Sequence, residues 1–210
     1  MNEKSYQFLR QIGNWVITLF ILNLSWIVFT VLGLGIFGFA PATYSVYEIL
    51  MDKEKKTTNQ LFSRFFRIYK RKFFDANLIG IAYVLIIFII GYNLMIYSEL
   101  SEYMSLAIWL YLFMFIFILL IHSFLIIFPL EMRFDYKNNF ELVRATFTIP
   151  FVFPIKTVFY LISISAILLV YFYIPILILI FGIIPIAFFT NGHIEYVKNK
   201  MIKIKEKKMK

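Results

Sequence analysis

Long apolar runs alternate with short basic segments along the whole chain. The apolar runs lie at residues 12–31, 36–51, 76–97, 106–129, 155–171 and 175–191. A helix needs about 20 mostly apolar residues to cross the hydrocarbon core of a bilayer. The pattern therefore predicts an all-α, polytopic membrane bundle of six hydrophobic segments, the second of them short or kinked, in a single domain over residues 1–210.

The first apolar run could be mistaken for a secretory signal, because Lys4 and Arg10 precede it. Its apolar core is much longer than the roughly 7–15 residues of a signal peptide, and polar sequence follows only far downstream. We expect residues 12–31 to be a retained first span.

Composition supports this interpretation and removes several classes of site. The chain is 61% hydrophobic and 20% aromatic, with a mean hydropathy of +0.81. Soluble domains are close to half apolar. The chain has no cysteine, which excludes disulfides, thiolate metal sites and cysteine nucleophiles.

The positive charges predict the topology. The 21 Lys and Arg residues all fall in four segments: the N-terminal lead, residues 52–75, residues 131–156 and the tail at 194–210. Cytoplasmic loops carry an excess of Lys and Arg. If residues 12–51 form a hairpin, all four segments lie on one side. We therefore expect a plasma-membrane protein with both termini cytoplasmic, and anionic lipid rather than nucleic acid as the partner of its +9 net charge.

Two of the basic segments also have an apolar stripe. Between residues 61 and 75, aromatic residues recur at helical spacing opposite arginines. A second such pattern, at Phe140, Val143, Phe147 and Phe151, lies within residues 131–156 and ends at Pro150 and Pro154. Both patterns predict interfacial amphipathic helices, although a cytoplasmic helix packed beneath the bundle explains the first equally well. The residues expected to contact anionic headgroups are Arg64, Arg67, Lys70, Arg71 and Lys72.

The stretch Gly33–Glu48 is rich in glycine and contains a literal G-x-G-x-x-G. A dinucleotide site needs that motif between a strand and a helix, and here a membrane span precedes it, so we reject that interpretation. Two others stay open. Small residues could form a tight turn between two helices, or Pro41 could start a half-helix whose N-terminus points into the membrane and binds a polar solute.

Polar residues within or beside the apolar runs, together with residues of the glycine-rich turn, are the candidate ligand-binding set. They are Asn23, Gly38, Pro41, Thr43, Asn77, Asn93 and His122. His122 is the deepest ionisable group, and a neighbouring helix is expected to satisfy it. No combination of residues forms a recognisable catalytic, cofactor or metal motif, so we expect no enzyme activity, no cofactor and no metal.

Three successive stretches resemble the YesL-like family of bacterial integral membrane proteins. They are Asn23-Leu-Ser-Trp26, then GLGIFGFAPATYSVYEIL from Gly33, then FFRIYKRKFFDANLIG from Phe65. The family pattern is kept best at Gly38, Pro41, Ala42 and Thr43, whereas Phe39-Ala40 and Lys72 depart from it. The resemblance implies a membrane protein of unknown biochemical function, whose relatives often accompany carbohydrate-uptake genes.

Two functions follow as expectations. The first is an accessory component of solute uptake or its regulation, which docks a permease or another membrane partner. The alternative is a small substrate-binding subunit of an importer. Convergence of the polar candidates on one cavity would favour the second, and their scatter over helix contacts would favour the first.

Overall fold

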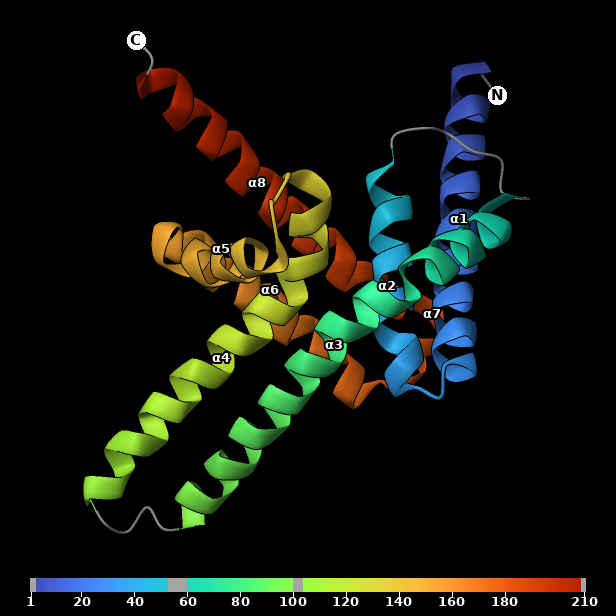
Figure 1. Ribbon diagram of the computed structural model, residues 1–210. Helices are drawn as coiled ribbons and strands as arrows, with labels where there is room; N and C mark the ends of the chain where they lie inside the picture. The colour runs from blue at the N-terminus through green and yellow to red at the C-terminus, as the bar shows by residue number, and fades with distance from the viewer. Residues whose placement is uncertain (1–2, 53–59, 100–103, 209–210) are drawn as a thin grey trace. The chain divides into compact units, whose positions relative to one another are not determined.

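The computed structural model describes residues 3–52, 60–99 and 104–208, and within those ranges the chain is helical with no strand (Figure 1). The predicted all-α class is confirmed. Lys53, Lys55 and Lys56 of the first basic segment lie outside the described residues. The helices are α1 (Glu3–Leu32), α2 (Ile36–Met51), α3 (Leu61–Glu99), α4 (Met104–Arg133), α5 (Asn139–Val152), α6 (Pro154–Tyr173), α7 (Ile176–Phe181) and α8 (Ile184–Lys208).

Among the residues that the structure describes, four helices are long and apolar enough to cross a membrane. The qualifying stretches are Ser5–Leu32, Leu61–Ser98, Ile108–Arg133 and Pro154–Tyr173. Only 11% to 28% of the most apolar window in each is buried inside the protein. Because so much apolar surface faces outward, these helices indicate a membrane protein.

The other two predicted segments are not full spans by this measure. Helix α2 has 16 residues, or about 24 Å of rise. The segment at 175–191 is interrupted: α7 ends at Phe181, Gly182 has a φ of 47°, and α8 begins at Ile184. Gly182 and Pro185 account for the break, since glycine tolerates positive φ and proline favours the first turn of a new helix.

The chain forms two compact units. Unit 1 contains residues 1–77 and 162–191, and unit 2 contains residues 78–161 and 192–210. Helices α3, α6 and α8 each contribute residues to both units.

In unit 1, α1 and α2 lie side by side as an antiparallel hairpin (Figure 1). The turn is a Schellman-type cap: Gly35 N–H donates to Thr30 O at 2.8 Å and Leu34 N–H to Val31 O at 2.9 Å, with φ values of 76° at Gly35 and 57° at Leu34. Helix α2 begins at Ile36, so Pro41 lies inside it. The tight-turn interpretation is confirmed, and the half-helix starting at Pro41 is wrong.

Helix α3 corrects another prediction. The basic, phenylalanine-rich segment is not a separate interfacial helix but the first turns of a continuous 39-residue helix. Its aromatic stripe packs around Phe29 of α1, with ring centroids 5.0–5.6 Å away at Phe62, Phe65, Phe66 and Tyr69. This packing explains why the stripe has helical spacing.

In unit 2, buried hydroxyl groups connect three helices. Tyr83 of α3 and Ser123 of α4 share a hydrogen bond of 2.5 Å, and Ser123 also bonds Thr146 of α5. Helix α5 is a separate 14-residue helix, as predicted, and its N-cap is Asn138, whose side chain accepts a hydrogen bond from Glu141 N–H. Its predicted position at the membrane interface stays a prediction.

Candidate functional site

A proline inside α2 leaves one backbone carbonyl without a hydrogen-bond donor, and a predicted ligand residue supplies the donor. Pro41 has no N–H, so the carbonyl of Phe37, four residues earlier, loses its helical donor. The Asn77 side chain donates to this oxygen at 2.9 Å and is itself only 6% exposed. In lipid, an unsatisfied carbonyl costs several kcal/mol. The Asn77 side chain therefore replaces the hydrogen-bond donor that Pro41 removes from α2.

Asn23 has the same role at the break between α7 and α8. Its side-chain nitrogen donates to Leu179 O at 2.8 Å, and Tyr171 O–H donates to Gly182 O at 2.7 Å. Both carbonyls lose their helical partners because α7 ends there. A Cβ built on Gly182 would lie 1.8 Å from Asn23 Oδ1, so the glycine is needed for this close approach.

The remaining candidates in the predicted ligand set are also used in the fold. Thr43 accepts a hydrogen bond from Trp26 Nε1 at 3.0 Å, and Asn93 donates to Ile89 O of its own helix at 2.7 Å. A Cβ on Gly38 would lie 2.4 Å from Thr30 O, so this glycine allows α1 and α2 to touch. Thr43 and Gly38 are thus used in the contact between α1 and α2, and Asn93 is used within α3.

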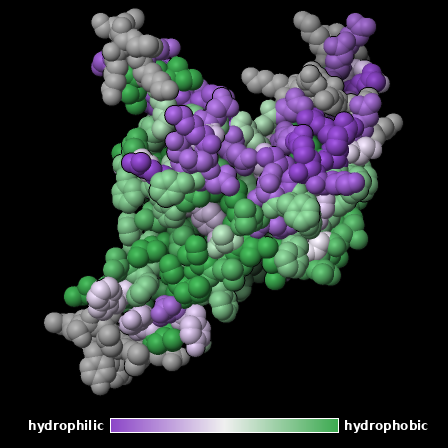
Figure 2. Space-filling view, in the orientation of Figure 1, coloured by the Kyte–Doolittle hydropathy of each residue, from purple (hydrophilic) through white to green (hydrophobic). Residues whose placement is uncertain are grey.

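The predicted lipid contacts divide into two groups. Arg64 pairs with Asp52, Arg71 with Glu48 at 2.6 Å, and Lys72 with Asp75 at 4.0 Å. Arg67 and Lys70 are exposed and make no ion pair with any described residue. Together with Ser63, Phe66 and Arg71 they line a shallow depression on α3. Figure 2 shows hydrophilic side chains gathered over this part of unit 1.

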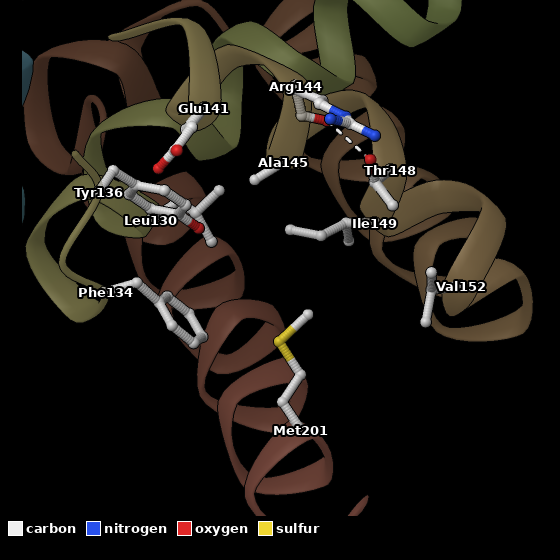
Figure 3. Close-up of a pocket in the computed structure, with 10 residues that line it drawn as sticks. All are labelled: Leu130, Phe134, Tyr136, Glu141, Arg144, Ala145, Thr148, Ile149, Val152 and Met201. Carbon is white, nitrogen blue, oxygen red and sulfur yellow. Dashed lines mark hydrogen bonds between the residues drawn. The ribbon is translucent and has the colours of Figure 1, made fainter. Parts of the chain in front are cut away.

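Unit 2 contains a pocket of about 300 Å³ that sequence reasoning missed (Figure 3). Arg144, Thr148 and Val152 of α5 lie on one side of it, while Phe134 and Met201 lie on the other. Tyr136 projects between these sides, and burial raises its pKa to about 12, so the phenol stays protonated. The lining comes from α4, α5, α8 and the loop after α4, which are too far apart in sequence for a local pattern to reveal the pocket.

The structure also corrects the expectation for His122. No described residue donates to or accepts from either of its ring nitrogens, although the residue is 0% exposed. Its neighbours in unit 2 are His193 and Tyr160, with ring centroids 5.7 Å and 5.8 Å away. His193 was not among the predicted site residues, and it is 7% exposed on α8. Within the described ranges, no group of three or more His, Cys, Asp or Glu residues could hold a metal ion.

Known proteins match the chain as follows. Residues 19–94 match the family described as "Protein of unknown function, DUF624". In Bacillus subtilis (strain 168), "Uncharacterized protein YteU" is 29% identical over 60% of this chain and 56% of its own length. "Uncharacterized protein YesL" is 27% identical over 71% of this chain and 69% of its own length. "Uncharacterized protein YesV" is 28% identical over 54% of this chain and 55% of its own length. The chain thus spans little more than half of YteU and YesV. No solved structure matches it.

Proposed function

Since this chain is a homologue of the YesL-like proteins, we propose that it is a non-enzymatic membrane scaffold that serves as an accessory component of solute uptake or its regulation. The observation that supports this function is the use of its intramembrane polar groups. The side chains of Asn23, Thr43 and Asn77 each form a hydrogen bond with another segment of unit 1, so these groups hold helices together. A transporter core would instead direct such groups into a solute cavity.

The exposed apolar surface suggests how a scaffold would engage a partner. In unit 2, Phe88 of α3 is 71% exposed and Tyr111 of α4 is 70% exposed. Figure 2 shows this part of unit 2 covered by hydrophobic side chains. Helices in lipid associate through close packing rather than through the hydrophobic effect, so a membrane partner would pack against these side chains.

Site-specific photocross-linking in the native host tests this proposal. A photoreactive phenylalanine analogue replaces Phe88 in one variant and Phe140 in a control; Phe140 is an equally exposed phenylalanine on α5, outside the four candidate spans. We expect a discrete adduct at position 88 containing an integral membrane transport protein, and no such adduct at position 140. Adducts with lipid alone at position 88 would contradict the scaffold.

The 300 Å³ pocket of unit 2 favours the second candidate, a subunit that captures a small substrate. A volume of this size lies at the lower end of ordinary ligand sites. Native mass spectrometry of the detergent-released protein would then detect a bound molecule. Met201→Trp should abolish it by filling the pocket, while Ile202→Trp, on the neighbouring exposed position, should retain it.

A further inference from the structure

The chain contains only two histidines, and the fold brings them together. His122 lies on α4 and His193 lies on α8, with Tyr160 of α6 beside both. The His193 and Tyr160 rings stack at 4.7 Å with an interplanar angle of 13°, while the His122 ring stands at 80° to each of them. All three residues belong to unit 2.

The cluster leaves several buried polar atoms without a partner among the described residues. They are both ring nitrogens of His122 and Nε2 of His193. Leaving a buried polar group without a hydrogen-bond partner is unfavourable. Such groups in a native protein call for an explanation, usually a water molecule or an ion.

We propose that His122 and His193 together bind a transition-metal ion. Imidazole nitrogens bind such ions at about 2.0–2.1 Å, so two rings on one ion have centroids separated by about 5 Å for tetrahedral geometry and somewhat over 6 Å for linear geometry. The observed separation of 5.7 Å lies between these limits. The distance between the two rings therefore allows them to share an ion.

The surroundings favour copper(I) among the ions that imidazole accepts. Zinc sites ordinarily use three or four protein ligands, and this cluster supplies two imidazoles. A single positive charge is also less costly to bury than a double one, particularly with Lys156 close enough to affect His193. Lys156 itself stacks over Tyr196, with its Nζ 4.9 Å from the ring centroid. His193 is neutral near pH 7, as a metal ligand must be, because burial and the charge of Lys156 lower its pKa to about 4.

Anaerobic titration with copper(I) against a chromophoric chelator tests the proposal, using full-length protein with a histidine-free affinity tag. We expect one ion per chain and at least about 100-fold weaker binding in His122→Asn and in His193→Asn. Tyr196→Phe is the matched control, since it alters a neighbouring ring of the same unit without removing an imidazole, and should bind as the wild type does. Binding that is absent, or equally strong in the histidine variants, would overturn the site.

A second measurement needs no variant and so does not depend on the variants folding. Protein labelled with ¹⁵N only in histidine gives signals from two imidazole rings, because the chain has no others. Copper(I) is diamagnetic, so both rings should shift together at one equivalent. A pair bridged by water alone would show no shift of either ring, and that result would also overturn the proposal.

Discussion

Pro41 and Asn77 act as a pair although they lie on different helices. The proline removes a donor from α2, and the asparagine of α3 supplies one to the same carbonyl, that of Phe37. The contribution of Asn77 to the free energy of unfolding should therefore depend on the residue at position 41. Such dependence distinguishes a structural partner from a ligand-binding residue, which would be indifferent to the proline.

We predict that Asn77→Leu lowers the free energy of unfolding by about 1–2 kcal/mol, because the Phe37 carbonyl loses its donor. In a Pro41→Ala background the residue at 41 has its own N–H, so the loss should become small. Thermal unfolding of the four proteins in one detergent measures this coupling. Asn93→Leu is the control, since Asn93 bonds only its own helix. Equal losses in both backgrounds would contradict the pairing.

The buried imidazole of His193 predicts a pH dependence. Its pKa is about 4 in the folded protein and about 6.5 when unperturbed, so between these values the unfolded chain binds more protons. Unfolding free energy then falls as pH falls, by about 2 kcal/mol from pH 7 to pH 5. Melting temperatures at the two pH values should diverge more for wild type than for His193→Asn. The same divergence in both proteins would show that other groups dominate.

At the scale of elements, glycines set the distance between α1 and α2. Cβ atoms on Gly33 and Gly38 would lie 2.3–2.4 Å from backbone atoms of the opposite arm of the hairpin. Backbone atoms cannot move aside as a flexible side chain can. The hairpin therefore needs glycine at both positions.

Gly38→Ala should destabilise the protein by more than about 2 kcal/mol, because α1 and α2 must separate. Gly13→Ala is the control: nothing lies within 4 Å of its Cβ, and alanine favours a helix by up to about 1 kcal/mol over glycine. Detergent melting curves of both variants test the pair. A Gly38→Ala protein as stable as Gly13→Ala would show that the helices are not in close contact.

The element boundaries show what a single sequence can and cannot predict. Residues 36–51 were predicted as one apolar segment and form α2 with those bounds, because hydrophobic length is a local property. Helix α3 was predicted as two helices because the composition changes from basic to apolar within it. The absence of proline from residues 61–99 was the sequence signal that it could be continuous. The meeting of His122 with His193 was not readable, because it depends on how α4 and α8 pack.

At the scale of the whole molecule, the distribution of charge predicts which side of the membrane each loop faces, and the helices alone do not. Reporters fused after Lys56 and after Lys210 should both be cytoplasmic, because the basic segments favour that side. A reporter inserted at residue 101, in the connector that carries only acidic charges, should be external. Alkaline phosphatase and green fluorescent protein fusions distinguish the two sides. An external signal from the reporter at Lys56 would show that residues 12–51 do not cross the membrane twice as a hairpin.

The hydrogen bond from Asn23 to the end of α7 has a consequence for biogenesis. The broken segment at 175–191 is synthesised after α1 and α6, and those two helices supply the hydrogen-bond donors to its open carbonyls. On its own, this segment is a poor substrate for insertion into lipid. We expect it to wait at the translocon until α1 is alongside, so that its insertion depends on a helix made much earlier in the chain.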